Sequence, residues 1–281
     1  MKKAKIIILA GQSNAVGVAH VKYLPRHFSK EKVAKFKEGY DGILMNYYSH
    51  DMKSNGFVKT TLNCAEKGKD TFGPEIGIAD YLSEKHPDEK NFIIKCAVGG
   101  TNIFYDWLPP SCKGEYQKES FGFGDTESEF YRKGGWLFNE LIKVLGESIS
   151  ILEKQGYEPE ICAFCWMQGE SDALEIETVE KYGERYENLL KDLNDTFGEY
   201  LKNCVYIDAG ISEIWPYYRE INAWKEEHAT KTPNSFYINT IAEGLTTSKE
   251  PEPEVDIAHY DSDCTIKLGY LFVENIKNEK H

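Results

Sequence analysis

The chain has 281 residues and a mass of 32.2 kDa, a length that fits one large α/β domain or two small ones. Apolar residues make up 41% of it, which is enough for a sizeable core, and the mean hydropathy of −0.52 indicates a polar surface. A formal net charge of −13 argues against nucleic acid and anionic membranes, because both are bound through basic patches. We therefore expect neither as a partner, and the oligomeric state is left open.

The seven cysteines favour free thiols in a reducing compartment over a disulfide framework. Cys162 and Cys165 form a C-x-x-C, but they lie in an apolar run typical of a buried strand, where residues three apart face opposite sides. We predict no metal at this pair. The apolar stretch after Met1 is shorter than the core of a signal peptide, and no run approaches the roughly 20 apolar residues of a membrane helix. The expected location is cytoplasmic.

Short apolar runs alternate with helical patterns along the chain. Runs that are continuously apolar indicate strands covered on both faces, as in a parallel sheet. In chain order the pattern predicts strand 5–9, helix 74–85, strand 92–98, helix 137–154, strand 161–167, helix 177–196, strand 205–208, helix 213–228, strand 236–239 and helix 265–277. This alternation predicts an α/β fold, a three-layer sandwich with a mainly five-stranded parallel sheet. Without a linker or an internal repeat, we expect residues 1–281 to form a single domain.

Two long stretches interrupt the alternation. Residues 20–71 form an excursion with one candidate strand at 42–47, and residues 101–135 form a loop rich in glycine and aromatic residues. Loops of this length in a compact domain are usually functional. Aromatic faces stack on sugar rings, but they also pack ordinary loops together, so both roles stay open. The aromatic residues concerned are Phe104, Tyr105, Trp107, Tyr116, Phe121, Phe123, Phe130 and Tyr131.

Two serines are candidate nucleophiles at the carboxyl ends of strands, where a parallel sheet forms its ligand crevice. Ser13 follows the first strand in Gly11-Gln-Ser-Asn, and Ser171 follows the third in Gly169-Glu-Ser-Asp. The first segment is also typical of an ordinary helix N-cap, and the second resembles a nucleophile elbow equally well. Spacing does not choose between them.

A candidate base lies just before the last predicted helix. Asp256 precedes His259 by three residues, which on a turn brings the carboxylate to the Nδ1–H of the imidazole and leaves Nε2 free to accept a serine proton. The alternative is an exposed polar turn. Donors for an oxyanion are available at two other strand ends, in the backbone of Gly99-Gly100-Thr101 and in the amide of Gln168.

Five segments together resemble the SGNH hydrolases, in the branch of sialate O-acetylesterases and acetylxylan esterases. In the family's order they are Gly11-Gln-Ser-Asn-Ala-Val-Gly, Phe72-Gly-Pro-Glu, Gly99-Gly-Thr-Asn-Ile with Trp107, Trp166-Met-Gln-Gly-Glu-Ser-Asp and Asp256-Ile-Ala-His. The resemblance implies a flavodoxin-like fold. The branch usually has His where Met167 stands, and often Gly where Asp263-Cys264 stands.

The resemblance also implies roles for single residues. Ser13 would be the nucleophile, His259 the base and Asp256 its orienting group, with Ser171 structural. The oxyanion hole would combine the N–H groups of Ser13 and Gly100 with the Gln168 amide. Supporting or substrate-binding roles are expected for further residues of these segments, namely Gln12, Asn14, Glu75, Thr101, Trp107 and Glu170. Glu170 is either a second carboxylate near His259 or an anchor for its loop.

The sequence thus predicts a serine esterase that removes O-acetyl groups from a carbohydrate through an acyl-enzyme, without metal or cofactor. The expected substrate is a small-molecule or oligosaccharide acetyl ester. One alternative is a thioesterase or lysophospholipase on the same fold, which would need an apolar acyl channel. Another is a catalytically silent carbohydrate-binding protein.

Overall fold

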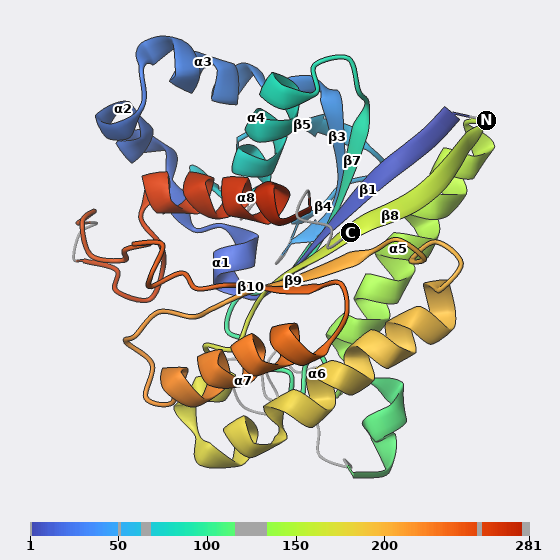
Figure 1. Ribbon diagram of the computed structural model, residues 1–281. Helices are drawn as coiled ribbons and strands as arrows, with labels where there is room; N and C mark the ends of the chain where they lie inside the picture. The colour runs from blue at the N-terminus through green and yellow to red at the C-terminus, as the bar shows by residue number, and fades with distance from the viewer. Residues whose placement is uncertain (1, 50–51, 63–68, 116–133, 252–254, 277–281) are drawn as a thin grey trace.

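The computed structural model describes residues 2–49, 52–62, 69–115, 134–251 and 255–276. Its centre is an eight-stranded sheet with the order β10-β9-β8-β1-β7-β3-β4, in which β5 also pairs with β3 (Figure 1). The strands are β1 (Lys2–Gly11), β3 (Tyr40–Ser49), β4 (Met52–Lys53), β5 (Val58–Thr60), β7 (Asn91–Ala97), β8 (Tyr157–Met167), β9 (Val205–Ala209) and β10 (Ser235–Ile238). A separate two-stranded sheet pairs β2 (Ala19–His20) with β6 (Thr71–Phe72).

Helices cover both faces of the large sheet, so the fold is a three-layer α/β sandwich, as predicted (Figure 1). One layer contains α4 (Glu75–Lys85) and α8 (Ser262–Ile276), which pack against each other. The other contains α5 (Trp136–Lys154), α6 (Ile176–Phe197) and α7 (Tyr218–Lys231). Shorter helices are α1 (Ser13–Val16), η1 (Val21–Tyr23), α2 (Leu24–His27), α3 (Lys30–Glu38), η2 (Pro110–Glu115) and η3 (Asp172–Leu174).

The central strands end in register. Gly11, the last residue of β1, pairs with Ala97 at the end of β7 and with Met167 at the end of β8. All three strands are parallel, so the segments that follow them emerge side by side at one edge of the sheet. These segments are residues 12–13, 98–103 and 168–172, which contain most of the predicted site.

The predicted strands and helices are present, with differences at three places. β3 runs parallel to β7, so six strands of the sheet are parallel rather than five. The described part of the excursion 20–71 also contains α3, a helix that was not predicted. This helix starts with a side-chain cap, in which Ser29 Oγ accepts the Lys32 N–H at 3.2 Å. It buries only Val33 and Phe36, too few apolar residues to give a clear helical period.

The helix expected at 213–228 begins later, at Tyr218. Pro216 accounts for the delay, because the residue before a proline is disfavoured in helical conformation, and Trp215 stands there. Cys162 and Cys165 lie in β8 as free thiols. Among the described residues, no helix combines the length and apolar character that crossing a membrane requires.

Candidate active site

The turn between β1 and α1 presents Ser13 to a cavity of about 920 Å³. Gly11 makes this turn with a φ of +143°, and a Cβ on it would lie 1.9 Å from the Met167 carbonyl oxygen. Only glycine fits so close to the neighbouring strand. The Gln12 N–H continues the ladder by donating to the same carbonyl at 2.9 Å. Ser13 is therefore fixed to the two central strands and half-exposed to the cavity.

Asp256 and His259 line the same cavity from the loop before α8. His259 Nδ1 lies 2.7 Å from Asp256 Oδ2, and the other carboxylate oxygen accepts the Ala258 N–H at 3.0 Å. The hydrogen bond to His259 lowers the pKa of Asp256 below its ordinary value. An ionised carboxylate can only accept, so Nδ1 carries the proton and Nε2 is left as the basic nitrogen. The predicted orienting contact is thus present.

The third wall of the cavity is the turn after β7, with Gly99, Gly100 and Thr101. Thr101 Oγ1 donates to the Val98 carbonyl at 2.7 Å and accepts the Trp107 indole N–H at 3.2 Å, so the turn is held from inside. Within the part of the chain that the structure describes, the N–H groups of Ser13 and Gly100 donate to no other backbone group. Both backbone donors remain available to a ligand.

Gln168 does not line the cavity, although the sequence places it at the same sheet edge. Its side chain is fully buried, and Nε2 donates to Gln12 Oε1 at 3.3 Å, to the Thr101 carbonyl at 3.2 Å and to Asp172. The amide expected to contact an oxyanion therefore joins the three strand-end segments beneath the cavity. Gln12 lines the cavity instead. Its amide nitrogen donates to the hydroxyl of Ser171, the second candidate nucleophile, and its amide oxygen accepts the Ser171 N–H.

Asp172 is a residue of the site for which the sequence analysis predicted no role. It is fully buried, and both its oxygens accept the Ile103 N–H, at 3.0 and 3.2 Å. Burial raises its pKa to about 7. The carboxyl group ties the turn after β7 to the segment after β8. Composition gave no signal for it, because Gly, Ser and Asp are common in solvated turns, but Asp172 is the last residue of the family-like segment that begins at Trp166.

Glu75 helps to hold α1, the short helix that begins at Ser13. Glu75 and Lys95 form a fully buried ion pair of 2.8 Å, and Lys95 Nζ also donates to the Val16 carbonyl at the end of α1, at 2.6 Å. The second Glu75 oxygen accepts the Gly73 N–H at 3.0 Å. Breaking such a pair leaves an uncompensated buried charge, which costs about 3–5 kcal/mol. Neither residue lines the cavity, so their role is to hold α1.

Trp107 is fully buried and packs edge-to-face on Trp166, with ring centroids 5.0 Å apart. This aromatic residue of the 101–135 loop supports the fold and has no free face for a sugar. Phe104 is also buried, under the guanidinium of Arg185. Tyr116, Phe121, Phe123, Phe130 and Tyr131 lie outside the described residues.

The cavity lining includes two lysines, Lys53 on β4 and Lys69 just before β6, in contrast to the acidic chain as a whole. His20 on β2 also lines it. Burial lowers the pKa of His20, so the imidazole is mainly neutral near pH 7. On the other side, after β8 and β9, Leu174 and Trp215 form an apolar wall.

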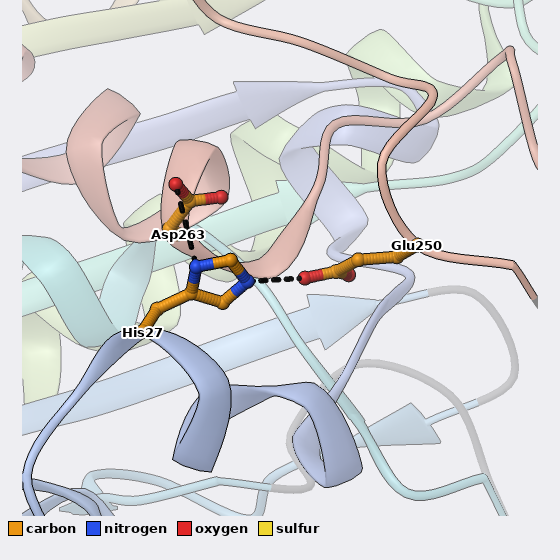
Figure 2. A group of neighbouring side chains, drawn as sticks. All are labelled: His27, Glu250 and Asp263. Carbon is orange, nitrogen blue, oxygen red and sulfur yellow. Dashed lines mark hydrogen bonds and ion pairs between the residues drawn. The ribbon is translucent and has the colours of Figure 1, made fainter.

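One group among the described residues has the composition of a metal site, namely His27, Glu250 and Asp263 (Figure 2). Glu250 approaches Nε2 of the imidazole at 3.1 Å, whereas Asp263 approaches Nδ1 at 3.7 Å. Carboxylates on two different ring nitrogens fit an ion-paired imidazole better than ligands of one ion. The group lies outside the cavity lining, and Glu250 also accepts the Ser262 N–H at 3.0 Å, which anchors the loop before α8.

Solved structures with similar folds span nearly the whole chain. A protein from Arabidopsis thaliana matches with a TM-score of 0.66 and 21% identity, covering 99% of both chains. NanS matches with a TM-score of 0.63 and 14% identity, covering 98% of this chain and 97% of its own. A carbohydrate acetylesterase from Xanthomonas citri matches with a TM-score of 0.62 and 14% identity, covering 98% of this chain and 56% of its own. No curated protein matches the sequence.

A family model covers residues 3–278, and its description is carbohydrate esterase, sialic acid-specific acetylesterase. The match includes every segment of the site, from the turn that contains Ser13 to the loop that contains Asp256. The chain therefore belongs to this family of carbohydrate esterases and is a carboxylic ester hydrolase.

Proposed function

We propose that the protein removes O-acetyl groups from a carbohydrate by a Ser-His-Asp acyl-enzyme mechanism. The observation that carries this proposal is the meeting of Ser13 with a carboxylate-oriented imidazole in one cavity, with His259 Nδ1 2.7 Å from Asp256. Family membership supports the acetyl ester as the bond that is cleaved.

In the first step Ser13 Oγ attacks the acetyl carbonyl carbon while Nε2 of His259 removes the hydroxyl proton. The carbonyl oxygen becomes an oxyanion, and in this proposal the N–H groups of Ser13 and Gly100 donate to it. His259 then protonates the sugar oxygen, which leaves as a free hydroxyl. The acetyl group stays on Ser13 until water, deprotonated by His259, releases acetate.

The role of Gln168 in this scheme is to hold the backbone donors. Its amide contacts the Thr101 carbonyl and the Gln12 side chain, so it fixes both segments that supply the oxyanion hole. A direct contact with the oxyanion would require the amide to leave these partners. We therefore propose a positioning role for it.

The substrate we propose is an acidic sugar that carries an O-acetyl group, such as an acetylated sialic acid. The family description names sialic acid, and Lys53 and Lys69 supply positive charge on one cavity wall. A carboxylate on the sugar would gain from this charge although the whole chain is acidic. The cytoplasmic location predicted from the sequence stays a prediction.

Trapping the acyl-enzyme tests the mechanism directly. The protein would be mixed with p-nitrophenyl acetate, quenched in acid within the first turnovers and digested for mass spectrometry. We expect one acetyl group on the peptide that contains Ser13 and none on the peptide that contains Ser171. An acetyl group on Ser171, or turnover without any acetylated serine, would contradict the proposal.

A further inference from the structure

Asn14, the residue after the candidate nucleophile, holds the main chain on both sides of His259. Its Oδ1 accepts the Tyr260 N–H at 3.0 Å, and its Nδ2 lies 3.4 Å from the Ala258 carbonyl oxygen. The side chain is buried, with 6% of its surface exposed. One short amide thus spans from the nucleophile turn to the two residues that flank the base.

Glu170 determines how this amide is oriented. Asn14 Nδ2 donates to Glu170 Oε1 at 2.8 Å, and Glu170 is buried at the segment after β8. A carboxylate only accepts hydrogen bonds, so the Asn14 nitrogen must face Glu170 and its oxygen must face the Tyr260 N–H. Burial raises the pKa of Glu170, while the hydrogen bond from Asn14 opposes that shift.

We propose that Asn14 and Glu170 form a positioning pair that sets the place of His259 relative to Ser13. The proposal rests on the function proposed above. Asn14 connects the nucleophile turn to the base loop, and Glu170 connects both to the central strand β8. Asp256 already occupies Nδ1 of the imidazole, so Glu170 acts on His259 through Asn14 and not as a second carboxylate partner.

The rest of the base loop shows why such a connection matters. Among the described residues, Tyr260 is also held from the opposite side of the chain, where its hydroxyl donates to the Gly210 carbonyl at 3.2 Å and its carbonyl accepts the Thr265 hydroxyl at 3.3 Å. These contacts fix Tyr260 to the segment after β9 and to α8, whereas the Asn14 contacts connect the residues beside His259 to the turn that contains Ser13. A displacement of about 1 Å between reacting groups can cost on the order of 10²-fold in rate. Loss of the Asn14 contacts should therefore lower kcat without removing any group that touches the substrate.

The chain offers a matched control in Asn222. Its Oδ1 accepts the Ile211 N–H at 2.8 Å and its Nδ2 donates to the Ile211 carbonyl at 2.9 Å. Like Asn14, it therefore binds the main chain through both atoms of its amide. It is buried to a similar degree, with 9% exposed, but it does not line the cavity. Substitution of either asparagine by alanine should cost a similar amount of stability.

The experiment measures kcat, KM and Tm with p-nitrophenyl acetate for Asn14→Ala, Asn14→Asp, Glu170→Ala, Glu170→Gln and Asn222→Ala. We expect Asn14→Ala and Asn14→Asp to lower kcat by about 10² with little change in KM, the second because it places two carboxylates in contact. Glu170→Ala should fall similarly. Glu170→Gln should keep most of kcat, since its amide oxygen can still accept from Asn14. Asn222→Ala should lose stability but keep kcat.

Three results would overturn the proposal. The first is wild-type kcat in folded Asn14→Ala. The second is an equal loss of kcat in Asn14→Ala and Asn222→Ala, which would indicate a general loss of structure. The third is a Glu170→Gln variant as inactive as Glu170→Ala, which would assign the effect to the Glu170 charge itself. Failure of the mechanism is separate, because it would appear as full activity in Ser13→Ala whatever the Asn14 variants do.

Discussion

The two halves of the candidate active site are built differently. One half follows the ends of three paired central strands and contains Ser13, Gly100 and the segment Gln168–Asp172. Buried hydrogen bonds connect the segments of this half. Asp256 and His259 sit on a loop, with 52% and 26% of their side-chain surface exposed. The strand-end half is fixed by the sheet, whereas the loop half depends on a few side-chain contacts.

This difference matches what each half must do. The nucleophile and the oxyanion donors must be placed before charge develops, since donors that have to reorient during the reaction stabilise it less. The imidazole has to accept a proton from one oxygen and return it to another, so it also needs a defined position, whereas the carboxylate of Asp256 is expected only to orient it. We therefore expect substitutions in the strand-end half to cause the largest losses, and changes in the exposed carboxylate to cause graded ones.

The largest expected effect is that of Ser13→Ala, which removes the proposed nucleophile. The kcat/KM for p-nitrophenyl acetate should fall by about 10³-fold or more, because the triad acts as a unit. Ser171→Ala should keep most of the activity, since the Ser171 hydroxyl accepts a hydrogen bond from Gln12 and we propose only a structural role for it. If the two variants gave reversed results, the nucleophile would be Ser171.

The next effect concerns the buried network under the strand ends. Gln168→Ala should lower kcat by about 10² with little change in KM, because the backbone donors lose their support. Asp172→Ala should do the same, and the double variant should be little worse than either alone, as expected for residues of one network. Additive losses would show instead that Gln168 contacts the oxyanion by itself.

The same contrast explains what the sequence could and could not predict. Apolar runs at β1, β7 and β8 predicted the sheet and so the edge at which Ser13, Gly100 and Gln168 emerge. The direction in which the Gln168 amide points was not predictable. It depends on Asp172 in the same segment and on Thr101 in the segment after β7, and the second contact has no local sequence pattern. Asp256 and His259 were found because they are three residues apart. The link from Asn14 to Tyr260 crosses 246 positions and has no local pattern.

The protein should favour short acyl groups, because the family to which the chain belongs is described as acetylesterases. An acyl chain too long for the site displaces the ester carbonyl from the reacting groups, and such a displacement lowers the rate steeply. We expect kcat/KM for the acetate ester to exceed that for the octanoate ester by about tenfold or more. A preference for octanoate would favour the thioesterase or lysophospholipase alternative.

The smallest expected effect is a shift in pH dependence that isolates the loop half. His259 must be neutral to accept the Ser13 proton, so kcat/KM should fall as pH decreases. The pKa of Asp256 lies below its ordinary value of 3.8 because of its hydrogen bond to His259, so the carboxylate is ionised over the whole acid limb. A variant without this negative charge lacks a contact that favours the protonated imidazole.

In Asp256→Asn the fall of kcat/KM on the acid side should therefore occur at lower pH. The shift should be less than about one pH unit, and smaller still at high salt, because water screens a carboxylate that is half exposed. The rate at the plateau should fall as well, since an amide does not hold the Nδ1–H tautomer as firmly.

Asp263→Asn is the control, and it should change neither quantity because Asp263 faces His27 instead. If Asp256→Asn kept both the limb and the rate, another group would orient His259. Glu170 would then be the first candidate, against the geometry that places its carboxylate on Asn14.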